Sequence, residues 1–258
     1  MDNIKRILSF TRRAVDDYQM IRPGDKIAVG ISGGKDSLTL LCALAELRRF
    51  YPVPFEVVAI TIDMGFAEPM VLTEVEALCE QLNVPYHIIK TEIYKIIFEV
   101  RQEKSPCSLC AKMRRGALHN AAKELGCNVV ALGHHFDDVV DTFMLNLFFE
   151  GRIGCFQPVT YLSRKDITLI RPMIYMPEKD VRYFASRSEL PVVKSTCPAD
   201  GNTERAEMQK LLTGLERTYP GLRYRIFGAI QRGEIDGFHV PGKGRMPGEK
   251  DYAAYENE

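Results

Sequence analysis

The sequence predicts an α/β protein with a parallel sheet that carries helices on both faces. Apolar runs of strand length, rich in Val and Ile, recur up to residue 170, and segments with helical periodicity separate them. A glycine-rich loop also follows the first of these runs directly and leads into an apolar helical segment. Parallel strands need such crossover connections, so the alternation indicates a sheet wrapped by helices.

The expected elements follow one another in chain order. An amphipathic helix at residues 3–20 precedes the first strand. Strands are expected at residues 26–31, 55–62, 86–89, 128–132 and 167–170. Helices are expected between them at residues 37–49, 69–82, 92–100, 109–125 and 137–149, and afterwards at 177–188 and 203–232. The last stretch is rich in Gly and Pro and has few apolar residues, which indicates a mobile tail.

These elements suggest four parts of the chain. We expect an N-terminal helix at 1–23, an α/β domain with an inserted cysteine-pair segment at 24–200, a C-terminal helical segment at 201–235 and a flexible tail at 236–258.

Composition excludes several classes of protein. The chain has 258 residues, of which 46% are apolar and 26% charged, and its 34 Lys and Arg balance its 34 Asp and Glu. A disordered chain, a collagen-like chain and a disulfide-rich mini-protein all have other compositions. No apolar run approaches the roughly 18 residues of a membrane span, so we expect a cytoplasmic protein without membrane contact. In a reducing cytosol, cysteines that matter are expected to be metal ligands or nucleophiles.

The loop after the first predicted strand has the character of a phosphate site. A strand, two adjacent glycines and a helix start direct free N–H groups toward an anion, and the helix dipole adds to the attraction. The two serines can donate to phosphate oxygens, Lys35 can neutralise one, and Asp36 can hold magnesium; a plain glycine-rich turn with a helix cap is the alternative. The spacing fits neither a Walker A loop nor a dinucleotide fingerprint. The candidate residues are Gly30, Ile31, Ser32, Gly33, Gly34, Lys35, Asp36 and Ser37.

A second polar motif, Gly133-His134-His135-Phe136-Asp137-Asp138, follows the strand expected at 128–132. Gly133 lets the chain pass close to a ligand at the carboxyl end of a strand, where open α/β sheets bind ligands. The two adjacent carboxylates can bind magnesium or simply cap the following helix.

Three cysteines form the third candidate site. Cys107 and Cys110 make a C-x-x-C just before the helix Lys112-Leu125, and Cys197 lies much later. Such a pair can be a redox couple, half of a zinc site or part of an iron–sulfur site. No second C-x-x-C completes a structural zinc site, whereas three thiolates leave one iron of a cluster open for sulfur. We interpret Cys42, Cys79 and Cys127 as small core residues and leave the role of Cys155 open.

These motifs carry a family resemblance. Ser-Gly-Gly-Lys-Asp-Ser at 32–37 resembles the PP-loop of the adenine nucleotide α-hydrolase-like ATP pyrophosphatases, and Gly-His-His-x-Asp-Asp resembles an element of tRNA thiolases and lysidine synthetases. Together with the cysteine pair and the late cysteine, over roughly residues 20 to 200, they resemble the tRNA 2-thiocytidine synthetase family. The segment after Cys197 lacks the second nearby cysteine that many members carry.

The resemblance implies an ATP-dependent tRNA sulfurtransferase. It would adenylate the C2 carbonyl of a cytidine in the anticodon loop and replace the oxygen with sulfur, giving 2-thiocytidine. It implies a [4Fe–4S] cluster on Cys107, Cys110 and Cys197, and Mg²⁺ near Asp36 and Asp138. It also implies nucleotide contacts at Thr61, Ile62, Asp63, Gly133, His134 and Asp138. Arg114 is implied as a basic residue near ATP. The implied partners are tRNA and a sulfur donor such as a cysteine desulfurase or free sulfide; a homodimer is one option for the assembly.

The charge pattern allows an RNA surface in spite of the zero net charge. Basic residues cluster near both ends and beside the cysteine pair, at Lys112, Arg114 and Arg115, although a charge run is more often a solvated face. An extruded base could stack on Phe136, Tyr161 or Tyr183. The rival functions are a thiolase for uridine or another tRNA base, a pyrophosphatase that delivers nitrogen, and a nucleotide- and cluster-binding sensor without turnover.

Overall fold

The chain forms two compact units. The computed structural model describes residues 4–66, 70–101, 106–193 and 204–240. The first unit comprises Met1–His135 and Pro158–Gly201, and the second comprises Phe136–Gln157 and Asn202–Glu258. The second unit thus contains the helix that follows the fourth strand together with the C-terminal helices.

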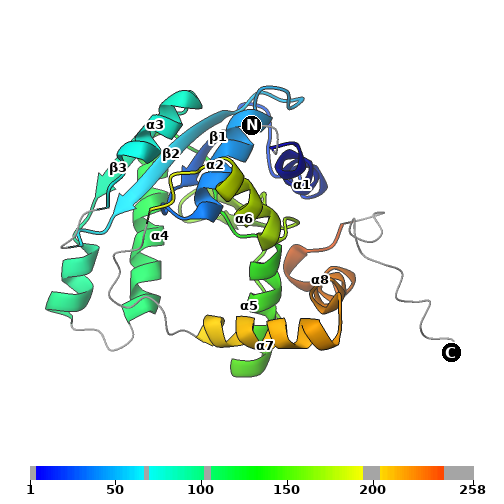
Figure 1. The fold of residues 1–258 in the computed structure, drawn as a ribbon. Helices are drawn as coiled ribbons and strands as arrows, with labels where there is room; N and C mark the ends of the chain where they lie inside the picture. Colours follow the sequence, from blue (N-terminus) through cyan, green and yellow to red (C-terminus); the bar gives the residue numbers. More distant parts are fainter. Residues whose placement is uncertain (1–3, 67–69, 102–105, 194–203, 241–258) are drawn as a thin grey trace, which may run out of the picture. The chain divides into compact units, whose positions relative to one another are not determined.

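A six-stranded sheet forms the centre of the first unit (Figure 1). Its order is β3-β2-β1-β4-β6-β5, and every neighbouring pair is parallel except β5 with β6. Chain order reverses at β1, which has β2 on one side and β4 on the other, and ligands of open α/β sheets bind at such a switch point. The strands are β1 Lys26–Gly30, β2 Glu56–Asp63, β3 Tyr86–Lys90, β4 Val129–Ala131, β5 Val159–Leu162 and β6 Ile167–Ile170.

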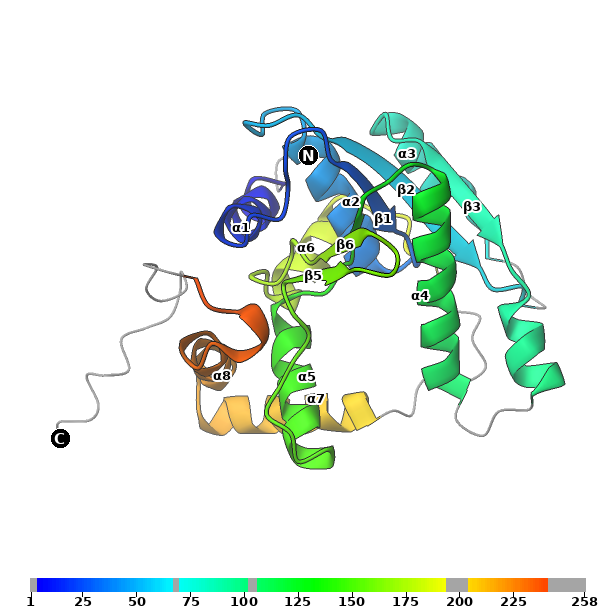
Figure 2. The same ribbon diagram turned by 180° about the vertical axis from the view of Figure 1, so that it is seen from behind.

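Helices cover both faces of this sheet, as the sequence predicts. Helices α1, α2 and α6 pack against one another on one face, whereas α4 and the π-helix η1 pack on the other (Figures 1 and 2). Ten of the thirteen residues of α2 are buried, because this helix lies between the sheet and the other helices of its layer. The helices of the first unit are α1 Ile4–Asp17, α2 Lys35–Leu47, α3 Thr73–Gln81, η1 Lys95–Val100, α4 Pro106–Glu124 and α6 Glu178–Arg187.

The second unit is helical. Helix α5 Phe136–Phe149 packs against α7 Glu204–Thr218 and α8 Leu222–Arg232, and a short 3₁₀-helix η2 Ile235–Gly237 follows. Its core is aromatic: the ring centroids of Phe136 and Phe227 are 4.9 Å apart, and those of Phe227 and Phe238 are 5.6 Å apart. All three rings are buried, so aromatic packing joins α5, α8 and the segment after η2.

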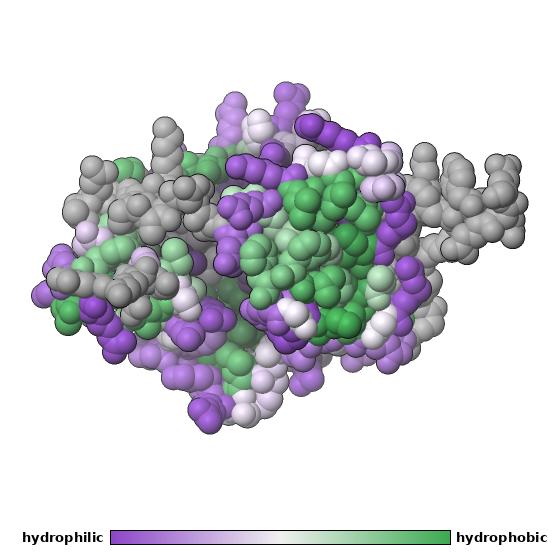
Figure 3. Space-filling model, turned by 90° about the horizontal axis from the view of Figure 1, so that it is seen from below, coloured by the Kyte–Doolittle hydropathy of each residue, from purple (hydrophilic) through white to green (hydrophobic). Residues whose placement is uncertain are grey.

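Several large apolar side chains of the second unit remain exposed. They are Leu147, Phe148 and Phe149 at the end of α5, Ile153 in the loop that follows, and Leu211 on α7. The view from below in Figure 3 shows apolar side chains gathered on one part of the surface, on the side where Figure 1 places the end of α5 and α7.

The structure differs from the predicted elements in three places. Strand β5 was not predicted, because its half-exposed residues form no long apolar run, and it makes the sheet mixed rather than all parallel. The helical pattern at 203–232 is two helices, since α7 ends at Thr218 and Gly221, with a positive φ of 84° after Pro220, is the N-cap of α8. The cysteine pair lies within the N-terminal end of α4, not just before a helix.

Two further observations concern the C-terminal part and membranes. Of the predicted tail, Phe238 is buried against Phe227, and residues 241–258 lie outside the described residues. Among the helices that the structure describes, none combines the length and the apolar character that crossing a bilayer requires. The four-part domain division remains a prediction.

Candidate active site

The PP-loop lies between β1 and α2, at the carboxyl edge of the sheet. Gly33 has a positive φ of 80°, which favours glycine, and Gly34 caps α2 without any side-chain bond. The hydroxyl of Ser37 donates to the Gly34 carbonyl at 2.9 Å and accepts the N–H of Ser32 at 3.2 Å. The serines therefore brace a loop whose first helical N–H groups are available to an anion.

Gly133 lies directly against this loop. A β-carbon at Gly133 would be 3.1 Å from the carbonyl carbon and oxygen of Asp36 and 3.2 Å from the nitrogen of Ser37. These are backbone atoms at the start of α2, so only glycine lets the two motifs approach so closely. The Gly133 turn and the PP-loop, predicted as separate nucleotide motifs, are thus brought together in the first unit.

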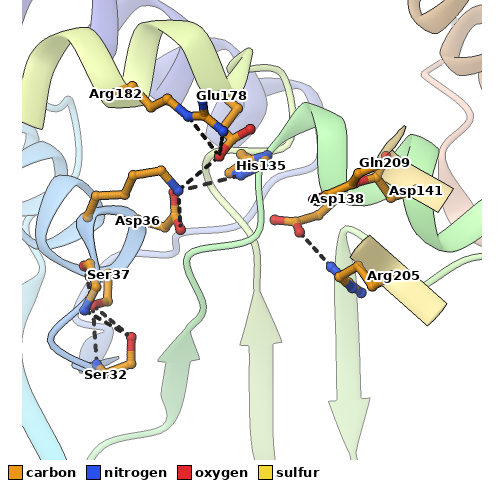
Figure 4. Close-up of polar contacts among 12 residues, drawn as sticks. Ser32, Asp36, Ser37, His135, Asp138, Asp141, Glu178, Arg182, Arg205 and Gln209 are labelled. Carbon is orange, nitrogen blue, oxygen red and sulfur yellow. Dashed lines mark hydrogen bonds and ion pairs between the residues drawn. The ribbon is translucent and has the colours of Figure 1, made fainter. Parts of the chain in front are cut away.

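Figure 4 shows a charged cluster beside the loop. Lys35 Nζ lies 3.0 Å from both carboxylate oxygens of Asp36 and 3.1 Å from Glu178 Oε1. His135 Nε2 lies 3.7 Å from Asp36 Oδ1, and its side chain is buried. Burial lowers the pKa of Lys35, but its bonds to Asp36 and Glu178 outweigh burial and raise the pKa above its ordinary value. Lys35 is therefore a cation at neutral pH.

The end of β2 lies next to the PP-loop strand, since Gly30 pairs with Ile60. The hydroxyl of Thr61 donates to the carbonyl of Ile31 at 3.2 Å and is 2.8 Å from the hydroxyl of Tyr86. Ile62 is buried, and Asp63 Oδ1 accepts the N–H of Gly65 at 2.9 Å. Thr61 therefore holds the strand to the loop, and its predicted contact with the nucleotide remains a prediction.

Two candidates of the second motif lie in different units. His134 follows Gly133 in the first unit and is half-buried. Asp138 lies in the first turn of α5, in the second unit, where its carboxylate accepts a bond of 2.7 Å from Arg205. Asp36 and Asp138 thus each have a cation partner, and a shared magnesium ion at these two carboxylates remains a prediction.

The cysteine pair lies at the N-terminal end of α4. Cys107 is exposed and Cys110 partly exposed, and their spacing of three residues places both thiols on one side of the helix. Cys110 Sγ lies 3.5 Å from the sulfur of Met64, which follows β2 directly. Arg114 is exposed one turn later on the same side of α4. The pair therefore lies at the carboxyl edge of the sheet, as the PP-loop does.

The third predicted cluster ligand, Cys197, lies outside the described residues. Within the described part of the chain, no three His, Cys, Asp or Glu side chains form a group that could hold a metal ion. Val193, the last described residue before the segment with Cys197, donates its N–H to the carbonyl of Gly33 at 2.9 Å. The chain therefore lies beside the PP-loop at the point where that segment begins. As a set of ligands, three cysteine thiolates suit an iron–sulfur cluster.

The other cysteines divide as predicted. Cys42, Cys79 and Cys127 are buried, which confirms that they are core residues. Burial raises the pKa of Cys42 to about 12 and that of Cys79 to about 11, so neither is a thiolate at neutral pH. Cys155 donates its N–H to Asp236 at 2.6 Å, and its thiol lies 3.4 Å from the carbonyl of Val139. These contacts are structural ones within the second unit.

One suggestion about RNA bases is wrong. Phe136 is 2% exposed and packs against Tyr224 and Phe227, so it cannot receive an extruded base. Tyr161 and Tyr183 are 61% and 60% exposed and remain candidates.

Glu178 and Arg182 belong to the site although sequence reasoning did not assign them a role. No spacing rule connects the start of α6 with residue 35. The one available signal was an acidic residue at a helix start after Pro177, which normally indicates a cap.

Comparisons with known proteins agree with this geometry. The model of the PP-loop domain family matches residues 6–215. The chain is 44% identical to tRNA-cytidine(32) 2-sulfurtransferase of Geobacter sulfurreducens over 89% of this chain and 91% of the relative, and 41% identical to that of Pelobacter propionicus over 88% and 85%.

The solved structures show the same kind of likeness. The U34-tRNA thiolase NcsA from Methanococcus maripaludis, solved with its [4Fe–4S] cluster, superposes with a TM-score of 0.71 at 27% identity, covering 92% of this chain and 80% of that chain. The family model, the relatives and the superposed structure all agree with the motifs in the first unit. The chain therefore belongs to the PP-loop family, in the group of the tRNA-cytidine(32) 2-sulfurtransferases.

Proposed function

We propose that this protein uses ATP to convert a cytidine in the anticodon loop of tRNA into 2-thiocytidine. The observation that carries the proposal is that the cysteine pair and the PP-loop share one edge of the sheet. Cys110 contacts Met64 at the end of β2, and β2 pairs with the strand that leads into the PP-loop. A nucleotide site and thiolate ligands at one edge suit a reaction that activates a carbonyl and then delivers sulfur. The relatives named above carry the same activity in their names.

In the first half-reaction, the cytidine O2 attacks the α-phosphorus of ATP, and the bond to pyrophosphate breaks. The PP-loop binds the pyrophosphate portion through the N–H groups at the start of α2 and through Ser32, Ser37 and Lys35. Negative charge grows on the departing pyrophosphate, so preorganised N–H donors and the Lys35 ammonium stabilise this transition state. Mg²⁺ would be held near Asp36, whose carboxylate faces Lys35.

In the second half-reaction, sulfur at the oxidation level of sulfide forms a bond to C2, and the C2–O bond breaks to release AMP. Cys107, Cys110 and Cys197 would hold a [4Fe–4S] cluster, which supplies an open iron position for the sulfur when it is bound. Of the chain's own residues, Cys107 and Cys110 present their thiols from the N-terminal end of α4, and Arg114 lies one turn further along. In this proposal, Arg114 has the role of a cation near the departing AMP.

The proposal includes the partners and the location. The tRNA would contact Lys112 and Arg115, which are exposed on α4 beside the cysteine pair. The sulfur would come from a cysteine desulfurase or from free sulfide, and a tRNA-modifying enzyme of this kind would work in the cytoplasm. A homodimer is also proposed, because the apolar side chains at the end of α5 remain exposed; light scattering tests it.

The test is pyrophosphate release together with nucleoside mass spectrometry on the anaerobically purified protein. We expect a brown protein with about four irons per chain, pyrophosphate release that depends on tRNA, and 2-thiocytidine in the digested tRNA. Cys107→Ala, Cys110→Ala and Cys197→Ala should each abolish 2-thiocytidine, and Cys155→Ala serves as the control that keeps it.

The outcomes separate the rival functions. Formation of 2-thiouridine would assign uridine as the base, and product formation that is indifferent to the three cysteines would indicate nitrogen delivery. Pyrophosphate release that does not respond to tRNA would favour a sensor, and a colourless zinc-loaded protein would contradict the cluster.

A further inference from the structure

The PP-loop lysine is shared between two carboxylates that come from different parts of the first unit. Asp36 is its neighbour in the loop, whereas Glu178 is the first residue of α6. Lys35 Nζ lies 3.0 Å from Asp36 and 3.1 Å from Glu178, and the three side chains are 28%, 34% and 24% exposed, respectively. An ammonium group has three N–H donors, and three carboxylate oxygens already face Lys35 Nζ, two from Asp36 and one from Glu178. A phosphate oxygen that binds Lys35 must therefore compete with these carboxylates.

A second cation, Arg182, also binds Glu178. Arg182, one helical turn further along α6, donates to Glu178 Oε1 from Nε at 3.1 Å and from Nη2 at 2.9 Å (Figure 4). This is the same oxygen that faces Lys35. Burial raises the pKa of Glu178, but Lys35 and Arg182 lower it by more, so the carboxylate stays charged at neutral pH. When Lys35 turns to a phosphate, Glu178 therefore keeps a partner and is not left as an uncompensated anion.

We propose that Glu178 is a positioning residue that holds Lys35 in the unliganded protein and competes with the phosphates of ATP for it. Arg182 moderates this competition, because it binds the same oxygen of Glu178 and weakens the attraction of that oxygen for Lys35. The competition weakens ATP binding relative to what the loop alone would give, and it helps pyrophosphate to leave, since Glu178 recovers Lys35. The inference rests on the proposed use of ATP and deepens it.

The test measures binding of MgATP and of inorganic pyrophosphate to the full chain by calorimetry. Glu178→Gln keeps the shape and removes the charge, so it should tighten pyrophosphate binding about threefold to fivefold and lower the KM for ATP, with kcat unchanged or reduced. Arg182→Gln should weaken pyrophosphate binding by a similar factor, because Glu178 then holds Lys35 more firmly. In a Lys35→Ala background, Glu178→Gln should have no effect.

Glu46→Gln is the matched control. Glu46 is 25% exposed and pairs with Arg49, which follows the end of α2 in the same unit, so its loss should leave pyrophosphate binding unchanged. Pyrophosphate binding to Glu178→Gln that is equal to or weaker than wild type, or a change that persists without Lys35, would overturn the inference. Arg182 is 67% exposed, so Arg182→Gln tests it even where Glu178→Gln folds poorly. A wild-type protein that binds neither MgATP nor pyrophosphate would instead refute the proposed function.

Discussion

At Gly133 the absence of a side chain lets two nucleotide motifs lie in direct contact. A β-carbon there would lie 3.1 Å from the carbonyl of Asp36 and 3.2 Å from the nitrogen of Ser37. Backbone at the start of a buried helix cannot yield as the end of a flexible side chain can. The residue at position 133 thus determines how closely the end of β4 and the PP-loop approach each other. The number of residues between the two motifs gives no indication of this contact.

Gly133→Ala should therefore push the PP-loop out of position. We expect a loss of ATP affinity, at a cost of about 1–3 kcal/mol shared between binding and stability, because added atoms in a tight contact force backbone shifts. Calorimetry with MgATP and thermal unfolding measure the two parts. Gly214→Ala is the control, since Gly214 is exposed on α7 with open space around it and should gain up to about 1 kcal/mol of stability. Unchanged ATP binding in Gly133→Ala would contradict this account of the contact.

At the scale of elements, ion pairs hold the helices of the second unit together. Arg223 on α8 lies 2.9 Å from Asp141 and 3.3 Å from Asp137, both on α5. Gln209 of α7 donates to the other oxygen of Asp141 at 2.9 Å. The side chain of Asp141 is 1% exposed and that of Arg223 is 15% exposed. The charge pattern of the sequence allows the basic residues near both ends to form part of an RNA surface, whereas Arg223 of the C-terminal group pairs with carboxylates inside the second unit.

Arg223→Ala should strongly destabilise the second unit. Removal of one partner leaves Asp141 as a buried charge, which costs about 3 kcal/mol or more. Adding Asp141→Asn should recover part of this loss, because the buried charge is then gone. Urea unfolding followed by circular dichroism measures both effects. Arg152→Ala removes a pair whose side chains are 56% and 59% exposed, and it should cost less than about 1 kcal/mol. Equal losses for Arg223→Ala and Arg152→Ala would show that burial of the ion pair is unimportant.

At the scale of the whole molecule, zero net charge is compatible with a local RNA surface. Basic and acidic side chains balance at 34 each, and many of the basic ones have acidic partners, such as Arg6 with Asp180. Lys112, Arg114 and Arg115 are exposed together on α4 beside the cysteine pair. Affinity for tRNA should therefore depend on a small number of phosphate contacts and fall with salt.

Replacing Lys112 and Arg115 with Gln should weaken tRNA binding and reduce the slope of its salt dependence by about two. Fluorescence anisotropy with labelled tRNA over a range of salt concentrations measures both quantities. Lys123→Gln changes a lysine of the last turn of the same helix, which pairs with Asp166, and should leave the slope as it was. A slope that is unchanged in the double variant would place the RNA surface elsewhere.

Much of the fold was predictable because its signals are local. Apolar runs and helical periodicity within a few residues located five of the six strands that the described residues form, together with the helices between them. The missed strand β5 pairs only with β6 at the edge of the sheet, and its half-exposed residues carry no such signal. The boundary at Gly221 was missed because a helical pattern on both sides of it continues in register, although Pro220 and Gly221 were visible breakers.

For this protein, the sequence by itself determined the fold class, the place of the PP-loop after the first strand, the cysteine pair and the family resemblance. Each depends on residues that are close together in the chain, so their chemistry and spacing can be read directly from the amino-acid sequence. Only the tertiary structure decided that Gly133 lies against the PP-loop, that Glu178 and Arg182 share the charge of Lys35 and that Arg223 is buried between carboxylates. Those contacts join residues far apart in the chain, and their energies depend on distance and burial, which packing alone sets.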